Sequence, residues 1–142
     1  MSKIAVVYWS GTGNTETMAN AVVEGVKAVG VDVELFQVDD FSADKMEGFS
    51  GFAFGCPAMG DEVLEEDSFE PFFAEAEEKI SDVPVALFGS YGWGGGTWME
   101  AWTDRTKAAG ANFIGNVIAE NAPEDDVIKN CEELGKKLAE AV

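Results

Sequence analysis

The 142-residue sequence contains no histidine and only two cysteines, Cys56 and Cys131. Without histidine there can be no Ser-His-Asp triad, histidine general base or histidine metal ligand, so hydrolases and zinc enzymes are disfavoured. Two cysteines outside a C-x-x-C motif are too few for a disulfide framework. We expect both to be small buried residues, and we expect no bound metal.

Basic residues are also scarce, because nine Lys and Arg stand against 27 Asp and Glu, a formal charge of −18. Nucleic acids and anionic membranes are bound through basic surfaces, so neither is an expected partner. Two explanations of the acidity stay open. It keeps a small abundant protein in solution, or it provides a docking surface for a basic partner.

Long apolar segments are absent as well. The N-terminal apolar run extends only from Ile4 to Trp9, which is shorter than the roughly 7–15 residues of a signal-peptide core. No other segment reaches membrane-spanning length. We therefore expect a cytoplasmic protein, and the length fits a single domain over residues 1–142.

Strand-like runs alternate with helix-like stretches along the whole chain. Strands are predicted at 4–8, 31–38, 49–55, 85–88 and 113–118, and helices at 14–29, 69–80, 98–109 and from near Pro123. Five short strands separated by helices predict a doubly wound α/β fold, in which a parallel sheet carries helices on both faces. Ligands of such sheets bind beyond the carboxyl ends of the strands, so the loops after strands one, three and four are candidate sites.

The loop after strand one reads Ser10-Gly11-Thr12-Gly13-Asn14-Thr15 and leads directly into a helix. Glycines let the backbone curl around an anion, while hydroxyls and the free N–H groups of the helix N-terminus donate hydrogen bonds to it. This pattern predicts a phosphate-binding loop, although a turn that only caps the helix is an alternative. The loop lacks the Lys of a Walker A motif, and Glu16 replaces the third glycine of a dinucleotide fingerprint.

The loop after strand three reads Cys56-Pro57-Ala58-Met59-Gly60-Asp61-Glu62. Gly60 and Asp61 form a turn pair, so the peptide between them could adopt two orientations at modest cost. Met59 is either a ligand contact or a residue that fills a gap in the core, and Glu62 is either a ligand contact or a solvated carboxylate.

The loop after strand four reads Gly89-Ser90-Tyr91-Gly92-Trp93-Gly94-Gly95-Gly96. Trp93 has no helix or strand face against which to pack, so we expect a partly exposed indole on which a ligand stacks. Trp98 and Trp102 stand at helical spacing and are predicted to be core residues.

Together, these three loops resemble the flavodoxins, specifically the short-chain clostridial and Megasphaera type, over essentially the whole chain. The resemblance rests on the segments 8–15, 58–62 and 87–94. It implies the family's strand order 2-1-3-4-5, non-covalently bound flavin mononucleotide (FMN), and low-potential one-electron transfer between redox enzymes. The protein would then be an electron carrier rather than an enzyme, with no catalytic residue.

The resemblance also assigns roles to residues. It implies that Ser10, Gly11, Thr12, Gly13, Asn14 and Thr15 hold the FMN phosphate, and that Met59 and Trp93 flank the isoalloxazine ring. Backbone around Gly60, Asp61, Ser90 and Gly92 would meet the pyrimidine edge and N5, Glu62 would accept from N3–H, and Ala58 and Tyr91 complete the predicted site. Pro57 departs from the clostridial pattern, where a hydroxyl residue assists the phosphate.

In the family the one-electron state is a neutral semiquinone with a hydrogen on N5. The Gly60 carbonyl could rotate to accept that hydrogen, which would stabilise this state selectively. A second electron would create an anionic hydroquinone beside phosphate and carboxylates, so its potential is expected to be low.

An acidic segment begins within the second loop and is predicted to guide redox partners to the flavin. It comprises Asp61, Glu62, Glu65, Glu66, Asp67 and Glu70. The expected partners are redox proteins with basic docking surfaces, bound transiently through a small interface, and the protein itself is expected to be a monomer.

Other classes fit less well. A nicotinamide-dependent dehydrogenase is suggested by Gly11-x-Gly13 and Asp39, but Glu16 and the short chain oppose it. A phosphoacceptor receiver domain would need acidic residues at the ends of strands one and three, and a phosphatase using Cys56 would need Arg where Glu62 stands. A flavin store stays open.

Overall fold

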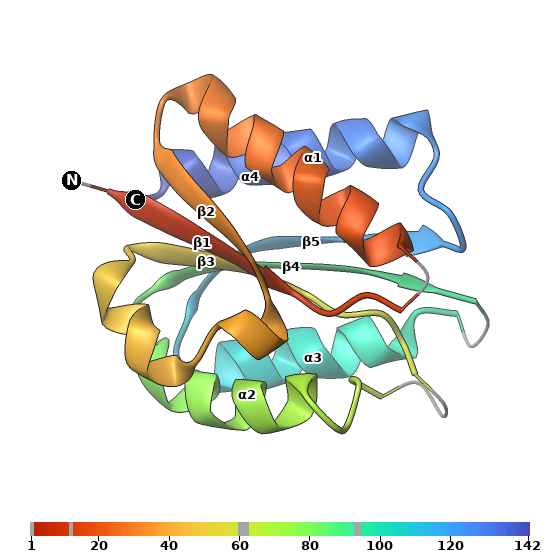
Figure 1. Ribbon diagram of the computed structural model, residues 1–142, viewed down its shortest axis with the longest axis horizontal. Coiled ribbons are helices and arrows are strands. Elements are labelled where there is room, and N and C mark those ends of the chain that lie inside the picture. The colour runs from red at the N-terminus through yellow and green to blue at the C-terminus, as the bar shows by residue number, and fades with distance from the viewer. Residues whose placement is uncertain (1, 12, 60–62, 93–94) are drawn as a thin grey trace.

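A parallel β-sheet forms the centre of the computed structural model, which describes residues 2–11, 13–59, 63–92 and 95–142 (Figure 1). Five strands of this described part are joined in the order β2-β1-β3-β4-β5. They are β1 (Lys3–Tyr8), β2 (Asp32–Gln37), β3 (Gly51–Gly55), β4 (Pro84–Tyr91) and β5 (Asn112–Glu120). The predicted fold class and strand order are confirmed. The predicted site residues Thr12, Gly60, Asp61, Glu62 and Trp93 lie outside the described residues.

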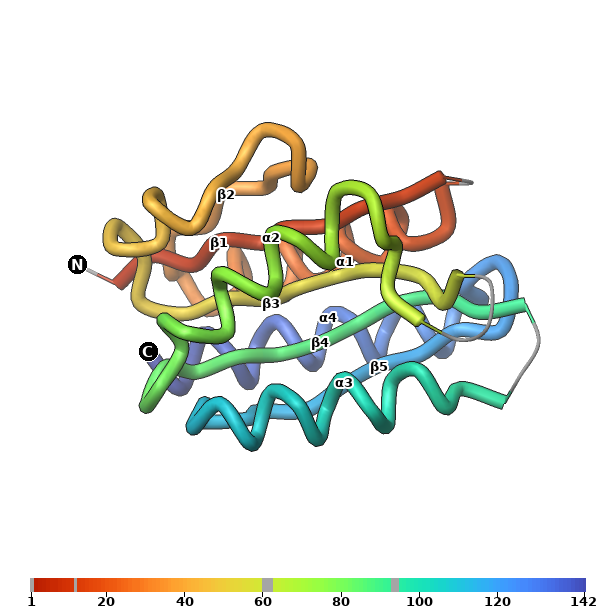
Figure 2. Tube along the Cα trace, turned by 90° about the horizontal axis from the view of Figure 1, so that it is seen from below, coloured from red at the N-terminus to blue at the C-terminus, as the bar shows by residue number. Residues whose placement is uncertain are grey.

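Helices cover both faces of the sheet (Figures 1 and 2). On one face lie α1 (Asn14–Val29) and α4 (Asp125–Glu140), and on the other lie α2 (Phe69–Ala76) and α3 (Thr97–Ala108). Short 3₁₀ turns occupy Val38–Asp40, Ala43–Gly48 and Glu77–Lys79. Helix α1 ends at Val29 and is capped by Gly30, whose φ of 89° is a left-handed conformation that favours glycine.

The core consists of two layers because successive strand residues point to opposite faces. In β1, Ile4 and Val6 pack toward α1 and α4, while Ala5 and Val7 pack toward α2 and α3. The strand is buried along almost its whole length, as its continuous apolar sequence predicts. Trp98, Trp102, Cys56 and Cys131 are buried, which confirms their expected positions.

Strand β4 is longer than the sequence predicts. Its pairing with β5 continues through Gly89↔Ile118 and Ser90↔Ala119 to Tyr91↔Glu120, so the first part of the predicted loop is strand. At Gly89 a Cβ would lie 2.2 Å from the carbonyl oxygen of Cys56, so the glycine permits close approach of β3 and β4 rather than a turn. Helix α2 is shorter than predicted and ends at Ala76.

No helix of the described part is long and apolar enough to span a membrane.

Candidate functional site

A pocket of about 250 Å³ lies at the carboxyl end of the sheet, where the chain leaves β1, β3 and β4. This is the edge at which parallel α/β sheets bind ligands. All three predicted loops contribute to its lining, which is Trp9, Gly11, Asn14, Pro57, Ala58, Met59, Ser90, Tyr91, Gly92 and Asn121. The structure therefore brings together residues that are up to about a hundred positions apart in sequence.

Seven predicted site residues line this pocket: Gly11, Asn14, Ala58, Met59, Ser90, Tyr91 and Gly92. Ser10, Gly13 and Thr15 lie in the adjoining turn into α1 and do not line it. Trp9, Pro57 and Asn121 line the pocket but are absent from the predicted site.

The first loop is organised around the Ser10 hydroxyl. Its Oγ accepts hydrogen bonds from the backbone N–H of Gly13 at 3.0 Å and of Glu16 at 3.3 Å. Gly13 has a φ of 96°, a left-handed conformation that favours glycine. Because the first N–H groups of a helix have no intrahelical acceptor, this end of α1 offers donors and a positive dipole end to an anion.

Glu16 stands where a dinucleotide-binding fingerprint has its third glycine, and it accepts a hydrogen bond from Tyr8, the last residue of β1. The Tyr8 hydroxyl donates to its Oε2 at 2.7 Å. Burial, and secondly this hydrogen bond, raise the pKa of Tyr8 above its ordinary value. The Glu16 side chain thus has a partner within the protein.

The second loop runs beside the end of β4. The Ala58 N–H donates to the Ser90 carbonyl at 2.9 Å, and Met59 and Val63 exchange two backbone hydrogen bonds of 2.8 and 3.0 Å. Met59 is half-buried and lines the pocket, so it is not a residue that only fills the core.

Asn121 could have been found from its position, because it directly follows β5 at the same edge of the sheet. Its φ is 60°, a conformation that Asn tolerates better than most residues, and its N–H donates to the Tyr91 carbonyl at 2.7 Å. Trp9 directly follows β1, and it lines the pocket because the chain turns there toward Gly11, whose added Cβ would lie 3.0 Å from the indole.

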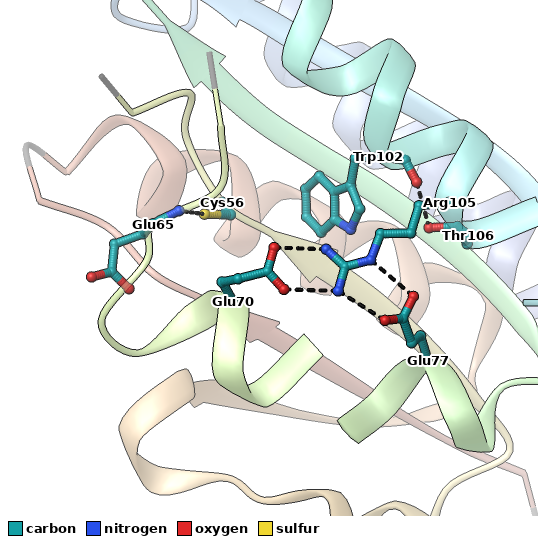
Figure 3. Close-up of polar contacts among 7 residues, drawn as sticks. All are labelled: Cys56, Glu65, Glu70, Glu77, Trp102, Arg105 and Thr106. Carbon is teal, nitrogen blue, oxygen red and sulfur yellow. Dashed lines mark hydrogen bonds and ion pairs between the residues drawn. The ribbon is translucent and has the colours of Figure 1, made fainter. Parts of the chain in front are cut away.

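The predicted acidic segment is only partly available to a partner (Figure 3). Glu65 is 7% exposed, and the Glu70 carboxylate accepts two hydrogen bonds of 2.7 Å from the Arg105 guanidinium. Arg105 also donates to both oxygens of Glu77, and these two carboxylates raise its pKa. Buried Glu65 is therefore not accessible to a docking partner, whereas Glu66 and Asp67 are the exposed residues among those of the segment that the structure describes.

The pocket combines apolar walls with neutral polar groups. Trp9, Tyr91 and Met59 supply aromatic and thioether surface, and Asn14 and Asn121 supply side-chain amides. In the part of the chain that the structure describes, no group of three His, Cys, Asp or Glu side chains is placed to bind a metal. Such a site suits a flat organic ligand with one anionic end at the first loop.

Comparisons with known proteins agree with this geometry. The sequence profile of the family described as Flavodoxin matches residues 6–135. The chain is 47% identical to the flavodoxin of Megasphaera elsdenii over 138 residues, 97% of this chain and 99% of that protein. It is 47% identical to the flavodoxin of Clostridium beijerinckii over 135 residues, 94% of this chain and 97% of that protein. The solution structure of two-electron reduced M. elsdenii flavodoxin superimposes with a TM-score of 0.90 over 96% of this chain and 98% of that one.

Proposed function

The chain belongs to the flavodoxin family of FMN-binding, low-potential electron carriers, and we propose that FMN binds in the pocket at the carboxyl end of its sheet. The protein is an electron carrier rather than an enzyme. The observation that carries the proposed site is the convergence of three loops on one pocket, with a helix N-terminus at one end.

The residues present fit the two ends of FMN. We propose that the phosphate lies in the loop from Ser10 to Thr15, where backbone N–H groups and hydroxyls donate to it without a lysine or arginine. The isoalloxazine ring then lies between Met59 and Trp93, with the backbone near Ala58, Ser90, Tyr91 and Gly92 at its polar edge. Bound FMN supplies two successive one-electron transfers, and the chain supplies its position and surroundings.

A ligand comparison tests the two ends of this site separately. Ser10→Ala removes the acceptor that orders the N–H groups of Gly13 and Glu16, so it should reduce the preference for FMN over riboflavin, which lacks the phosphate. Thr17→Val is the control, because its hydroxyl bonds to the Gly13 carbonyl on the exposed side of α1. Equal weakening of FMN and riboflavin by Ser10→Ala would place the phosphate elsewhere.

The second and third loops have predictions of their own. Trp93→Ala should weaken the binding of FMN and of riboflavin alike, because stacking depends on the ring. An unaltered dissociation constant would remove this role.

Gly60→Ala should leave FMN bound but reduce the amount of protein that holds one electron at half reduction, because rotation of the peptide after residue 60 becomes costly. Glu62→Gln should weaken binding of the ring more than that of the phosphate.

In three of the helices, acidic and basic side chains lie at opposite ends of the helix. The first turns of α1, α3 and α4 carry Glu16, Glu100 and Asp125, while their last turns carry Lys27, Lys107 and Lys137. Since these helices begin at the carboxyl end of the sheet, their acidic first turns lie at that end. We propose that it docks transiently to redox proteins with basic surfaces, using exposed Glu66 and Asp67 beside the pocket.

Salt dependence tests this docking surface. Electron transfer to a basic c-type cytochrome should slow as ionic strength rises, and the double variant Glu66→Gln/Asp67→Asn should flatten that dependence. The double variant Glu75→Gln/Glu78→Gln removes the same charge at the opposite end of the α2 region and should keep the wild-type slope. A rate that is insensitive to salt would contradict the proposal.

We also infer that residues 1–142 act as a single domain and as a monomer in the cytoplasm. The single sheet formed by all five described strands supports the first point, and the net charge of −18, which repels a second copy, supports the second. Two free thiols, Cys56 and Cys131, support a reducing compartment. Sedimentation of the FMN-loaded protein at physiological salt would test the monomer.

A further inference from the structure

The Glu65 carboxylate is buried close to the loop that supplies Met59 to the proposed FMN site. A buried carboxylate is costly unless hydrogen bonds compensate for its lost hydration, and here three backbone groups do so. Its Oε1 accepts from the N–H groups of Ser68 and Phe69 at 2.8 Å each, and its Oε2 accepts from Asp67 N–H at 3.0 Å.

These N–H groups lie immediately before and at the start of α2. The helix receives no hydrogen bond from the Ser68 side chain, although serine is a favoured residue at that position. Glu65 therefore takes the role of the cap, with a negative charge at the positive end of the helix dipole. The carboxylate fixes the point at which the second loop enters α2.

The Glu65 backbone is also bonded to the beginning of the same loop. Its N–H donates to the Cys56 Sγ at 3.3 Å, as Figure 3 shows. Cys56 is fully buried just after β3, where its N–H donates to the Phe88 carbonyl at 3.1 Å and its carbonyl accepts from Trp98 Nε1 at 3.2 Å. The chain thus leaves this buried junction at Cys56 and returns to it at Glu65.

Among the described residues of the chain between Cys56 and Glu65, Met59 and Val63 are joined by a pair of backbone hydrogen bonds. Pro57, Ala58 and Met59, in the first half of this segment, line the pocket. The hydrogen bonds between Met59 and Val63 therefore join the part of the chain that leads to Glu65 directly to a residue that lines the pocket. Exposed Glu66, the next residue in sequence, makes no part of this junction in the described structure.

We propose that Glu65 is a positioning residue of the FMN site, which sets the one-electron potentials by holding the loop from Cys56 to Glu65 rather than by its charge. The inference rests on the proposed function. In Glu65→Gln one amide oxygen can still accept from Ser68 and Phe69, while the amide NH₂ would face the Asp67 N–H that Oε2 accepts. This variant keeps the size of the side chain and loosens the junction.

The experiment measures both one-electron midpoint potentials of FMN-loaded wild type, E65Q and E66Q. Because E66Q removes the same charge one residue away, it is the matched control. The equilibrium constant for placing the first electron on the bound flavin should fall about tenfold in E65Q, which corresponds to about 1.4 kcal/mol of lost selective stabilisation, and should change less than about twofold in E66Q. Glu65→Ala should show a larger fall if it folds.

Three results would overturn the inference. An equilibrium constant that rises in E65Q would show that the charge of Glu65 matters, because removing a nearby negative charge favours electron uptake. Wild-type potentials in E65Q together with a lowered unfolding midpoint would show that Glu65 only stabilises α2. If the wild-type protein binds no FMN, or takes up both electrons in one step, the proposed function is overturned and this inference with it. The titration of the wild-type protein alone shows that result.

Discussion

The hydroxyl groups of Thr15 and Ser90 lie 3.2 Å apart in the interior, although the two residues are 75 positions apart in sequence. Thr15 is 1% exposed and Ser90 is 5% exposed. Their contact joins the first turn of α1 to the end of β4. The first loop and the third loop are therefore held in one relative position by a contact within the protein itself.

A double-mutant cycle on this pair should reveal the contact. Thr15→Val and Ser90→Ala should each cost about 1–2 kcal/mol, because each leaves a buried hydroxyl without its partner. The double variant should cost less than the sum, with a coupling of about 0.5–1.5 kcal/mol. Urea unfolding of the FMN-free protein measures all four values, and strictly additive losses would contradict the hydrogen bond.

Helices α1 and α4 cross with their backbones in contact, which predicts intolerance of any side chain at two glycines. A Cβ on Gly25 would lie 1.9 Å from the Glu132 carbonyl oxygen, and one on Gly135 would lie 2.2 Å from that of Val22. Gly25→Ala and Gly135→Ala should each lower the free energy of unfolding by about 1–3 kcal/mol through overpacking.

Gly48→Ala is the control for this crossing, because a Cβ there meets no atom within 4 Å. It should change the unfolding free energy by less than about 0.5 kcal/mol. If Gly25→Ala were as harmless as Gly48→Ala in thermal or urea unfolding, the close crossing of the helices would be wrong.

Local sequence signals predicted the elements whose ends are set locally. Helix α1 was expected at 14–29 and is found there, because Gly13 and Gly30, both with positive φ, mark its two ends. Strand β4 was expected to end at Phe88, but its length is decided by pairing with β5, and a run of glycines does not reveal such pairing. The sheet order came with the family resemblance rather than from periodicity.

In the candidate site, too, local features could be predicted from the sequence and long-range contacts could not. Loops proposed to bind through consecutive backbone groups, such as Ser10 to Thr15, can be recognised in the sequence. Whether a carboxylate is available to a partner cannot be recognised in this way, because Glu70 is ion-paired with Arg105, 35 residues away, and Glu65 accepts hydrogen bonds from the start of the following helix. Asn121 reaches the pocket from the loop after β5, which, like the loop after β2, was not among the three loops predicted to form the site.

The two buried tryptophans of α3 should respond differently to the same substitution. Both are 2% exposed, but Trp98 Nε1 donates to the Cys56 carbonyl, whereas Trp102 Nε1 has no acceptor among the described residues. Both Phe variants lose similar packing, yet Trp98→Phe also leaves a buried carbonyl unpaired, an additional cost of about 1–3 kcal/mol. Equal losses in unfolding free energy would argue against the indole–carbonyl hydrogen bond.

Stability should decline in alkali through the buried thiols. Burial raises the pKa of Cys131 from 9.0 to about 12 and raises that of Cys56 as well. The unfolded thiols therefore ionise first as the pH passes about 9, and the stabilisation present below that pH is lost as the pH rises toward the folded value. Urea unfolding at about pH 8 and about pH 10 should show the loss, and Cys131→Ala should reduce it. An unchanged slope in that variant would contradict the assignment to Cys131.

The most direct test of the account is an anaerobic reductive titration of the FMN-loaded protein, followed by visible absorbance. We predict two separate one-electron steps, with strong long-wavelength absorbance at half reduction and a second step at a much lower potential. Reduction in a single two-electron step, or a protein that fails to bind FMN, would contradict the claim that this chain carries electrons singly on a flavin held by its three loops.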